Sequence, residues 1–190
     1  SHTSENSHKD AEADSKSKTP DGKFKNLNGE NVSYVHGFHT FALSGNEFSI
    51  PCKFSEFEKA GFTIRNDEDK KIKPGEFNGY AYYEEDGTYR GTIFIFNTSD
   101  KDIVPEKGIV GGLTLNPGSP VGKNDLKLVG DLGFESQPDD FGQVLGYQLT
   151  NYVSMSNYTS YEWYFEDEGY YTSLQAQYGA VSYTHLRAHE

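Results

Sequence analysis

The segment PGSPVGKN, residues 117–124, has the glycines and the lysine of a phosphate-binding loop. Such a loop needs four residues between its two glycines, followed by Lys, a hydroxyl residue and a helix. Here Gly118 and Gly122 are one residue too close, Asn124 stands where the hydroxyl residue would be, and no helical pattern follows. We therefore interpret the segment as a Pro/Gly turn and expect no nucleotide cofactor.

Metal ligation has few candidates in this sequence. His36 and His39 are the only close histidine pair away from the termini, and at this spacing in an extended segment their rings point to opposite faces. The acidic runs Asp67–Asp69 and Glu166–Glu168 lack the alternating oxygen ligands and the glycine of a calcium loop. We expect solvated acidic turns and no metal.

Nucleophilic chemistry has one thiol to consider, Cys52, which is the only cysteine and so cannot form an intrachain disulfide. No partner pattern accompanies it, which favours a small buried apolar side chain. The sequence also lacks a nucleophile-elbow motif. Paired carboxylates of a glycosidase stand far apart in sequence, so a small secreted hydrolase of cell-wall or dietary polymers stays an alternative to our expectation that the chain is not an enzyme.

Composition excludes several classes of partner. The 190 residues carry a net charge of −12 and the pI is about 4.9, which disfavours attraction to nucleic acid or to anionic lipids. The longest apolar cluster, Ile93–Phe96, has the length of a strand and not of a membrane span. We expect a monomer that binds no nucleic acid.

The N-terminal residues 1–25 are polar and rich in Ser, Lys, Asp and Glu. Such a composition cannot offset the entropy lost when the backbone is ordered, so it predicts a disordered tether. A polar tether without a start Met is typical of an exported bacterial protein after removal of its signal peptide. We expect an extracellular or cell-surface location, with membrane contact only through a hypothetical N-terminal lipid anchor.

Hydrophobic patterning then predicts a first helix-and-hairpin unit over about residues 38–100. Alternating apolar residues over 41–50 predict a β-hairpin around Ser44–Glu47, and 54–60 predict a short helix closed by Gly61. Asp86-Gly87 predicts a two-residue hairpin turn between two aromatic strands. Ile93–Phe96 is apolar at every position, which predicts a central strand covered on both faces.

A second unit follows over about residues 109–178. Short strands are predicted at 112–115 and 126–129, and Ser136 is predicted to cap a helix that runs through Leu145 to Gly146. An aromatic hairpin turning at 166–169 completes it. Because YAYYEEDGTYRG and YEWYFEDEGYYT align almost residue for residue, we interpret the units as tandem α-β-β repeats. The predicted fold class is α+β, with an antiparallel sheet and short helices.

The second hairpin also predicts a binding surface. If Phe165 pairs with Tyr170, one face carries the core residues Tyr161, Trp163, Leu174 and Ala176, and the other carries Glu162, Tyr164, Tyr171, Ser173 and Gln175. Tyr offers a large, rigid contact area at low entropic cost. We therefore predict binding of a surface protein or glycan through Tyr83, Tyr164, Tyr171 and Gln175, with core packing as the other interpretation of each tyrosine.

The order of the two units, FALSGNEFSIPCKFSEFEKAGF and LVGDLGFESQPDDFGQVLG each running into an aromatic hairpin, resembles uncharacterised extracytoplasmic lipoproteins of Gram-positive gut bacteria. The second unit is also similar to the helix-plus-sheet units of folds like the β-lactamase inhibitor proteins and outer-membrane-assembly lipoproteins. This resemblance covers about Phe38 to Tyr178 and implies a binding or assembly role without chemistry. The proline usual after the second helix is absent, with Gly146-Tyr147-Gln148 in its place.

The C-terminal VSYTHLRAHE, residues 181–190, has no counterpart in the repeated pattern. It resembles sequencing-adapter DNA translated in frame, and a basic C-terminal tail is the other interpretation. We therefore expect a metagenomic fragment whose natural reading frame was cut near Ala180. On this interpretation the tail belongs to no site and its deletion leaves the core intact.

Overall fold

The computed structural model describes residues 23–25, 31–33, 39–117, 126–146, 149–167, 170–179 and 183–189. Within the strands at 23–25, 31–33, 165–167, 170–172 and 183–189 it describes the backbone alone. The predicted tether lies outside these ranges except for 23–25, and so do His36 and most of PGSPVGKN.

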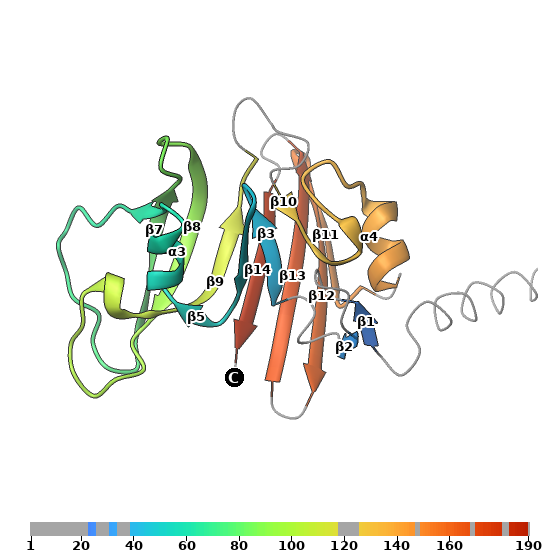
Figure 1. Ribbon diagram of the computed structural model, residues 1–190. Coiled ribbons are helices and arrows are strands. Elements are labelled where there is room, and N and C mark those ends of the chain that lie inside the picture. The colour runs from blue at the N-terminus through green and yellow to red at the C-terminus, as the bar shows by residue number, and fades with distance from the viewer. Residues whose placement is uncertain are drawn as a thin grey trace, which may run out of the picture.

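A nine-stranded antiparallel sheet dominates the fold (Figure 1). Across the sheet its strands are β11 (Asn151–Ser154), β12 (Tyr158–Asp167), β13 (Tyr170–Gly179), β14 (Tyr183–His189), β9 (Ile109–Leu115), β8 (Tyr89–Phe96), β7 (Phe77–Tyr83) and β6 (Thr63–Ile64), and β5 (Cys52–Lys53) also pairs with β9. A second sheet has the order β10 (Leu126–Lys127), β3 (Thr40–Leu43), β4 (Asn46–Ser49), and β1 (Lys23–Lys25) pairs with β2 (Asn31–Ser33). Among the described residues, the helices are α3 (Ser55–Lys59), α4 (Pro138–Leu145) and the 3₁₀ turns η2 (Pro105–Lys107) and η3 (Val129–Asp131). The α+β class predicted from the sequence is confirmed.

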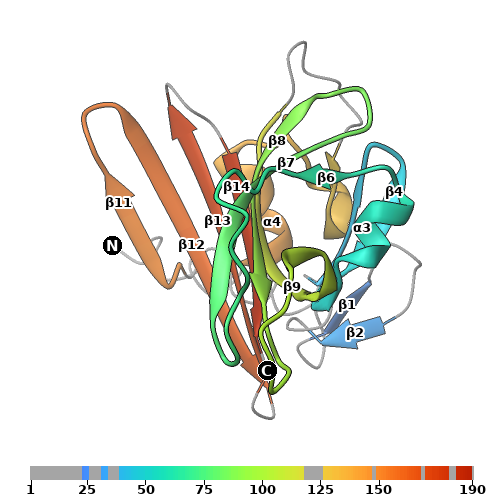
Figure 2. The same ribbon diagram turned by 90° about the vertical axis from the view of Figure 1, so that its left-hand side faces the viewer.

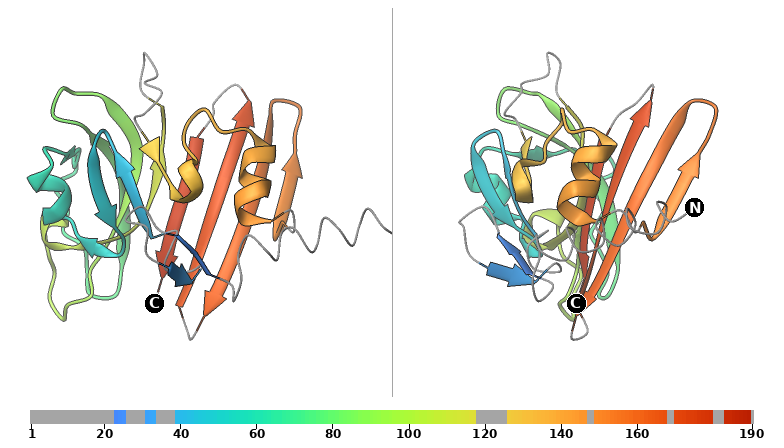
Figure 3. Two further views of the ribbon diagram at one scale, coloured as in Figure 1. Left: turned by 45° about the vertical axis from the view of Figure 1, so that its right-hand side comes forward. Right: turned by 90° about the vertical axis from the view of Figure 1, so that its right-hand side faces the viewer.

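Both α-helices and the three-stranded sheet lie on one side of the large sheet, as two views agree (Figures 1 and 3). The core fills the space between these layers. Phe57 of α3 stacks on Phe48 of β4 with ring centroids 4.1 Å apart, and Phe141 of α4 stacks on Trp163 of β12 at 5.7 Å. Helices this short gain their stability from such packing and not from their own hydrogen bonds.

The hairpin turns differ from the sequence prediction. Ser44 and Gly45, between β3 and β4, both have positive φ (50° and 81°) and form the two-residue turn. At the second hairpin, Gly87 has positive φ, Asp86 does not, and the Glu84 N–H donates to the carbonyl of Thr88. The loop is therefore three residues long, a turn closed by one left-handed glycine, and the predicted two-residue turn was wrong.

The N-terminus of α4 is also built differently from the prediction. Gln137 is the cap residue, and its backbone N–H donates to the Asp140 carboxylate at 2.7 Å. Ser136 instead accepts a hydrogen bond from the N–H of Gly133 at 2.8 Å, which fixes the loop before the helix. The helix still ends at Leu145 and Gly146 follows with φ of 88°, as the sequence predicted.

The β12–β13 hairpin has a register two residues away from the one assumed in the sequence analysis. Phe165 pairs with Thr172, and Tyr170 pairs with Asp167. A shift of two residues keeps every side chain on its face. Trp163 and Leu174 are accordingly buried at 2% and 0% exposure, as predicted.

The strand β8 is central, as predicted, but the structure describes cover on one face only. Ile93 and Ile95 point to the helices and are fully buried. Phe94 and Phe96 point the other way and are only partly buried, with no described helix over them. Apolar residues at every position predicted a second covering layer, and aromatic packing along the sheet surface explains them instead.

The predicted tail forms a strand of the large sheet. In β14, Leu186 pairs with Leu174 of β13 on one side and with Leu113 of β9 on the other. This places β14 between β9 and β13, two strands that both belong to the second predicted unit. The structure thus gives the tail a place inside the sheet, and its adapter origin stays a prediction that the fold does not address.

Candidate binding surface

The face of the large sheet that points away from α3, α4 and the small sheet is the candidate site, and we call it the outer face. Residues that pair across strands share a face. The buried row Trp163, Leu174, Leu113, Ile93 therefore defines the inner face, and its sequence neighbours define the outer one. One outer row runs through Tyr164, Ser173, Arg187, Gly112, Phe94 and Gly79, across six strands.

Two of the predicted binding residues come together on the outer face. Tyr164 of β12 is 41% exposed, and Gln175 lies on the adjacent β13, paired with Glu162. The Gln175 amide donates to the Ser160 hydroxyl at 2.6 Å, which holds the side chain against the sheet. The position of Tyr171 pairs with Glu166 next to this group, and its side chain lies outside the described residues.

Tyr83 belongs to a separate group at the far side of the same sheet. It lies on β7, five strand spacings from β12, or about 24 Å at a spacing of about 4.8 Å. Its ring is 5.6 Å from that of Tyr89, which is 46% exposed. Hydrogen bonds from Arg65 to Asp67 and to Tyr83 raise the pKa of the Arg65 guanidinium. The four predicted residues therefore share a face without forming one pocket.

Sequence analysis missed the largest exposed aromatic cluster on this face. Phe77 is 54% exposed, stacks on Phe96 with centroids 4.8 Å apart, and meets Phe94 edge to face at 6.4 Å. In the sequence, Phe77 directly follows the mostly polar residues 66–76, which contain a Pro-Gly pair. In a strand, Phe77 shares a face with Gly79 and Ala81, and Tyr80 and Tyr82 lie on the other face. This spacing was the signal that could have assigned Phe77 to the outer face.

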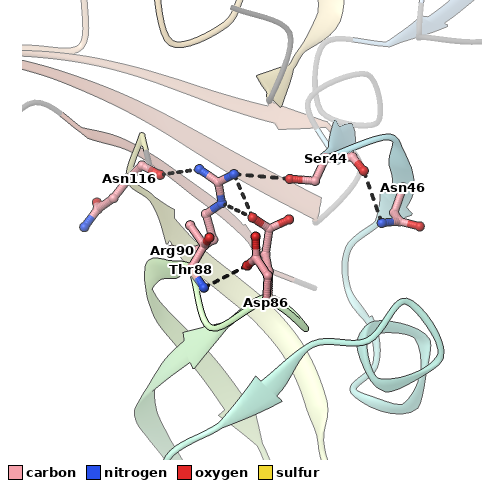
Figure 4. Close-up of polar contacts among 7 residues, drawn as sticks. Ser44, Asn46, Asp86, Thr88, Arg90 and Asn116 are labelled. Carbon is pink, nitrogen blue, oxygen red and sulfur yellow. Dashed lines mark hydrogen bonds and ion pairs between the residues drawn. The ribbon is translucent and has the colours of Figure 1, made fainter. Parts of the chain in front are cut away.

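A buried arginine on the inner side fixes the β7–β8 hairpin that carries this cluster (Figure 4). Arg90 is 2% exposed and donates to the Glu84 carboxylate at 2.8 and 2.9 Å. It also donates to the Asn116 carbonyl and the Ser44 hydroxyl, each at 3.2 Å, and its guanidinium lies 5.9 Å from the centroid of the Phe134 ring. One side chain thus ties the hairpin to the β3–β4 turn and to the end of β9.

Of the other candidate sites, His36, most of residues 117–124 and the side chains of residues 166–168 lie outside what the structure describes. Among the described residues, no three His, Cys, Asp or Glu side chains are grouped to hold a metal. Burial, with a smaller contribution from Glu56, raises the pKa of the Cys52 thiol to about 11, so it is protonated at neutral pH and a poor nucleophile. A groove of about 810 Å³ lies beside α4 and is lined in part by Lys127, Asp131 and Asp140.

Comparison with known proteins adds no relative. No protein family, no curated protein and no solved structure matches the chain. Within the part of the chain that the structure describes, no helix has the length and apolar character to span a membrane. The case for a function therefore stands on the geometry of the outer face.

Proposed function

We propose that this protein is a non-enzymatic binding module outside the cell, which presents its outer face to a partner protein. The observation that carries the proposal is the exposure of aromatic side chains on a sheet face that no described helix covers: Phe77 at 54%, Tyr89 at 46% and Tyr164 at 41%. Aromatic residues are enriched at the centres of protein interfaces, where they supply most of the binding free energy.

The shape and charge of the surface favour a protein over a small molecule. Small ligands bind in concave pockets that bury most of their surface. The outer face is instead an extended sheet surface on which Gln175, Ser173 and Thr114 stand between the aromatic groups. Because the chain carries a net charge of −12, a partner with a neutral or basic surface would approach it most readily.

The strands that carry the outer face are held in place by side-chain contacts on the inner face of the sheet. The Arg90 cluster holds β7 and β8 from the inner side, and the stack of Phe141 on Trp163 holds β12. Side chains on such a scaffold lose little further freedom when a partner binds, which lowers the entropic cost of association. The hydrolase alternative has no observation in its favour among the described residues.

The test compares capture by outer-face variants with capture by a matched control. Immobilised protein would be exposed to solubilised surface proteins of the source community, with captured partners identified by mass spectrometry and their affinity then measured. Phe77→Ala together with Tyr164→Ala should weaken binding of the identified partner at least tenfold, since truncation of a hot spot costs about 2 kcal/mol or more. Val104→Ala is the control, because Val104 is as exposed as Tyr164 (40% against 41%) and lies just before η2, outside the strands of the sheet.

Three results would contradict the proposal. The first is equal loss of affinity in the control and the outer-face variant. The second is binding on a glycan array that depends on Phe77 and Tyr164, without any protein partner, which would assign the same surface to carbohydrate. The third is a fall in the melting temperature of the double variant that matches its loss of binding, which would show that these residues pack the sheet and do not bind a partner.

A further inference from the structure

The strand β11 ends the large sheet, and its outer edge faces no described strand. Figure 2 shows β11 at the margin of the sheet, separated from the helices and the small sheet. Its other edge pairs with β12, with Asn151 opposite Glu162 and Val153 opposite Ser160. An unpaired edge offers a row of backbone donors and acceptors to another strand.

The register shows which backbone groups point outward. The Met155 N–H donates to the Tyr158 carbonyl at 2.8 Å, and the backbone groups of alternate residues in an antiparallel strand point to the same edge. Asn151 and Val153 therefore bond toward β12, and Tyr152 and Ser154 direct their N–H and C=O groups away from it. Outside the β11–β12 ladder, no backbone hydrogen bond of Tyr152 or Ser154 is found among the described residues, and β12 is the one described strand that pairs with β11.

This edge also lacks the charges that usually protect a strand. Residues 141–161 form the longest stretch of the chain without Asp, Glu, Lys or Arg. Natural edge strands are commonly guarded by Lys, by Pro or by inward-pointing charges. At the opposite end of the sheet, β6 has only two residues and is followed by Arg65 and the acidic run Asp67–Asp69.

The absence of charged residues on β11, in a chain that is otherwise strongly acidic, indicates which partner suits this edge. Two copies of a chain with a net charge of −12 repel each other over most of their surfaces, so contact between copies requires a region free of carboxylates. The β11 edge is such a region, and it adds the exposed apolar side chains of Tyr152 (53%) and Met155 (56%). An acidic or basic partner strand would gain no ion pair from β11 itself.

We infer that β11 is the interface for a second copy of this chain, joined edge to edge about a twofold axis. The antiparallel pairing that uses the outward groups places Tyr152 opposite Ser154 of the second copy, and Val153 opposite Val153 at the axis. Each copy then donates two backbone hydrogen bonds and accepts two, so the pattern is self-complementary. The expectation of a monomer from sequence gives way here to a dimer with one continuous sheet.

The central test removes one outward donor and leaves the β11–β12 ladder intact. Ser154→Pro deletes an N–H that points away from β12, and edge strands tolerate proline at such positions. Ser154→Ala keeps the N–H and is the matched control. Sedimentation velocity of the unmodified chain up to millimolar concentration should show a monomer–dimer equilibrium, and the dissociation constant should rise at least about tenfold in Ser154→Pro, which loses two hydrogen bonds by symmetry, but not in the control.

A cross-link gives a second measurement that does not depend on proline. Residues at a non-hydrogen-bonded antiparallel pair have Cα atoms about 4.5 Å apart, which suits a disulfide. In a Cys52→Ala background, Val153→Cys should form a covalent dimer on mild oxidation, and Glu68→Cys, on an exposed loop, should not. A monomer at every concentration, equal dimerisation of both Ser154 variants, or equal cross-linking of both cysteine variants would each overturn the inference.

Discussion

The two hairpins β7–β8 and β12–β13 occupy opposite halves of one sheet, and each is fixed from its inner face by a different chemistry. In the first, the Arg90 guanidinium reaches Glu84, Ser44 and Asn116. In the second, the indole of Trp163 stacks on Phe141 and donates to the Gly146 carbonyl at 3.1 Å. A buried charge network fixes the orientation of the hairpin at little net gain in the free energy of unfolding, whereas burial of aromatic side chains raises that free energy directly.

On the outer face the polarity of the two hairpins is reversed: the hairpin with the polar anchor is apolar there, and the hairpin with the apolar anchor is more polar. The half with the polar anchor exposes the phenylalanine cluster of Phe77, Phe94 and Phe96, and the half with the apolar anchor exposes Tyr164, Ser173 and Gln175. Similar backbones therefore present two surfaces of different chemistry on one face. Variants that affect one half more than the other test this comparison.

The largest effect is expected where the halves meet. Deletion of residues 181–190 removes β14, which is hydrogen-bonded to β13 and to β9 and is their only described connection across the sheet. We expect loss of the single cooperative unfolding transition, because the lost ladder is large relative to a typical stability of about 5–15 kcal/mol. Circular dichroism during urea unfolding measures it, and an unchanged midpoint would show that the strand contributes nothing to the core.

Removal of the apolar anchor should have the next largest effect. Trp163→Ala leaves a cavity against Phe141 and is expected to lower the free energy of unfolding by about 3–5 kcal/mol. Tyr164→Ala, one residue away on the outer face, should cost less than about 1 kcal/mol. Because Trp163 is the only tryptophan, both are compared by circular dichroism; similar losses would contradict the assignment of faces.

Loss of the Arg90–Glu84 ion pair should destabilise the fold less when both residues are replaced together than when Arg90 alone is replaced. Arg90→Ala leaves the Glu84 carboxylate, which is 15% exposed, without its ion pair, and we expect a loss of about 2–4 kcal/mol. Arg90→Met combined with Glu84→Met should recover most of it, since an apolar pair of similar size replaces the charges. Urea unfolding of the three proteins measures the difference. A double variant as unstable as Arg90→Ala would show that the network raises the free energy of unfolding in addition to orienting the hairpin.

The smallest effect concerns alkaline pH. The folded state raises the pKa of Cys52 from 9.0 to about 11, so the fold favours the protonated thiol. Its contribution is complete below pH 9 and is lost as the pH rises toward 11, by about 1–2 kcal/mol after allowance for partial exposure. Cys52→Ala should reduce the loss of stability over this interval. The buried hydroxyl of Tyr82, whose pKa burial also raises, gives both proteins the same further decline.

Much of the fold was predictable because local patterns agree with the tertiary structure. The hairpin at 41–50, the helix ending before Gly61 and the inner faces of β12 and β13 follow from apolar spacing. The turn at Asp86-Gly87 was predicted wrongly because the hydrogen bond between Glu84 and Thr88 adds a residue to the loop, a choice that depends on strand twist.

The candidate site was predictable only in part. Tyr164 and Gln175 were found because alternation along one hairpin assigns a face. Their separation from Tyr83 depends on strand order, which places β8, β9, β14 and β13 between β7 and β12 and cannot be inferred from local spacing. Arg90 had no sequence signal, since its partners Ser44 and Asn116 are distant in the chain.

The C-terminal segment was interpreted by its likeness to translated adapter DNA and its lack of a repeat counterpart, and its strand pattern was overlooked. Thr184, Leu186 and Ala188 alternate with polar residues, as a half-buried strand requires. The prediction of an adapter origin remains, and sequencing the source locus across codon 180 tests it. Different codons after Ala180 would support it, and the same ten codons in the genome would refute it.

The central position of β14 also sets the order of events in biosynthesis. Of all the described strands it leaves the ribosome last, yet its partner β9 is made long before it, since Leu186 pairs with Leu113. Contacts so distant in sequence slow folding, because a long loop must close before they form. The edge of β9 therefore stays without this partner during most of the synthesis that follows it, and in that interval it is open to mispairing or to a chaperone.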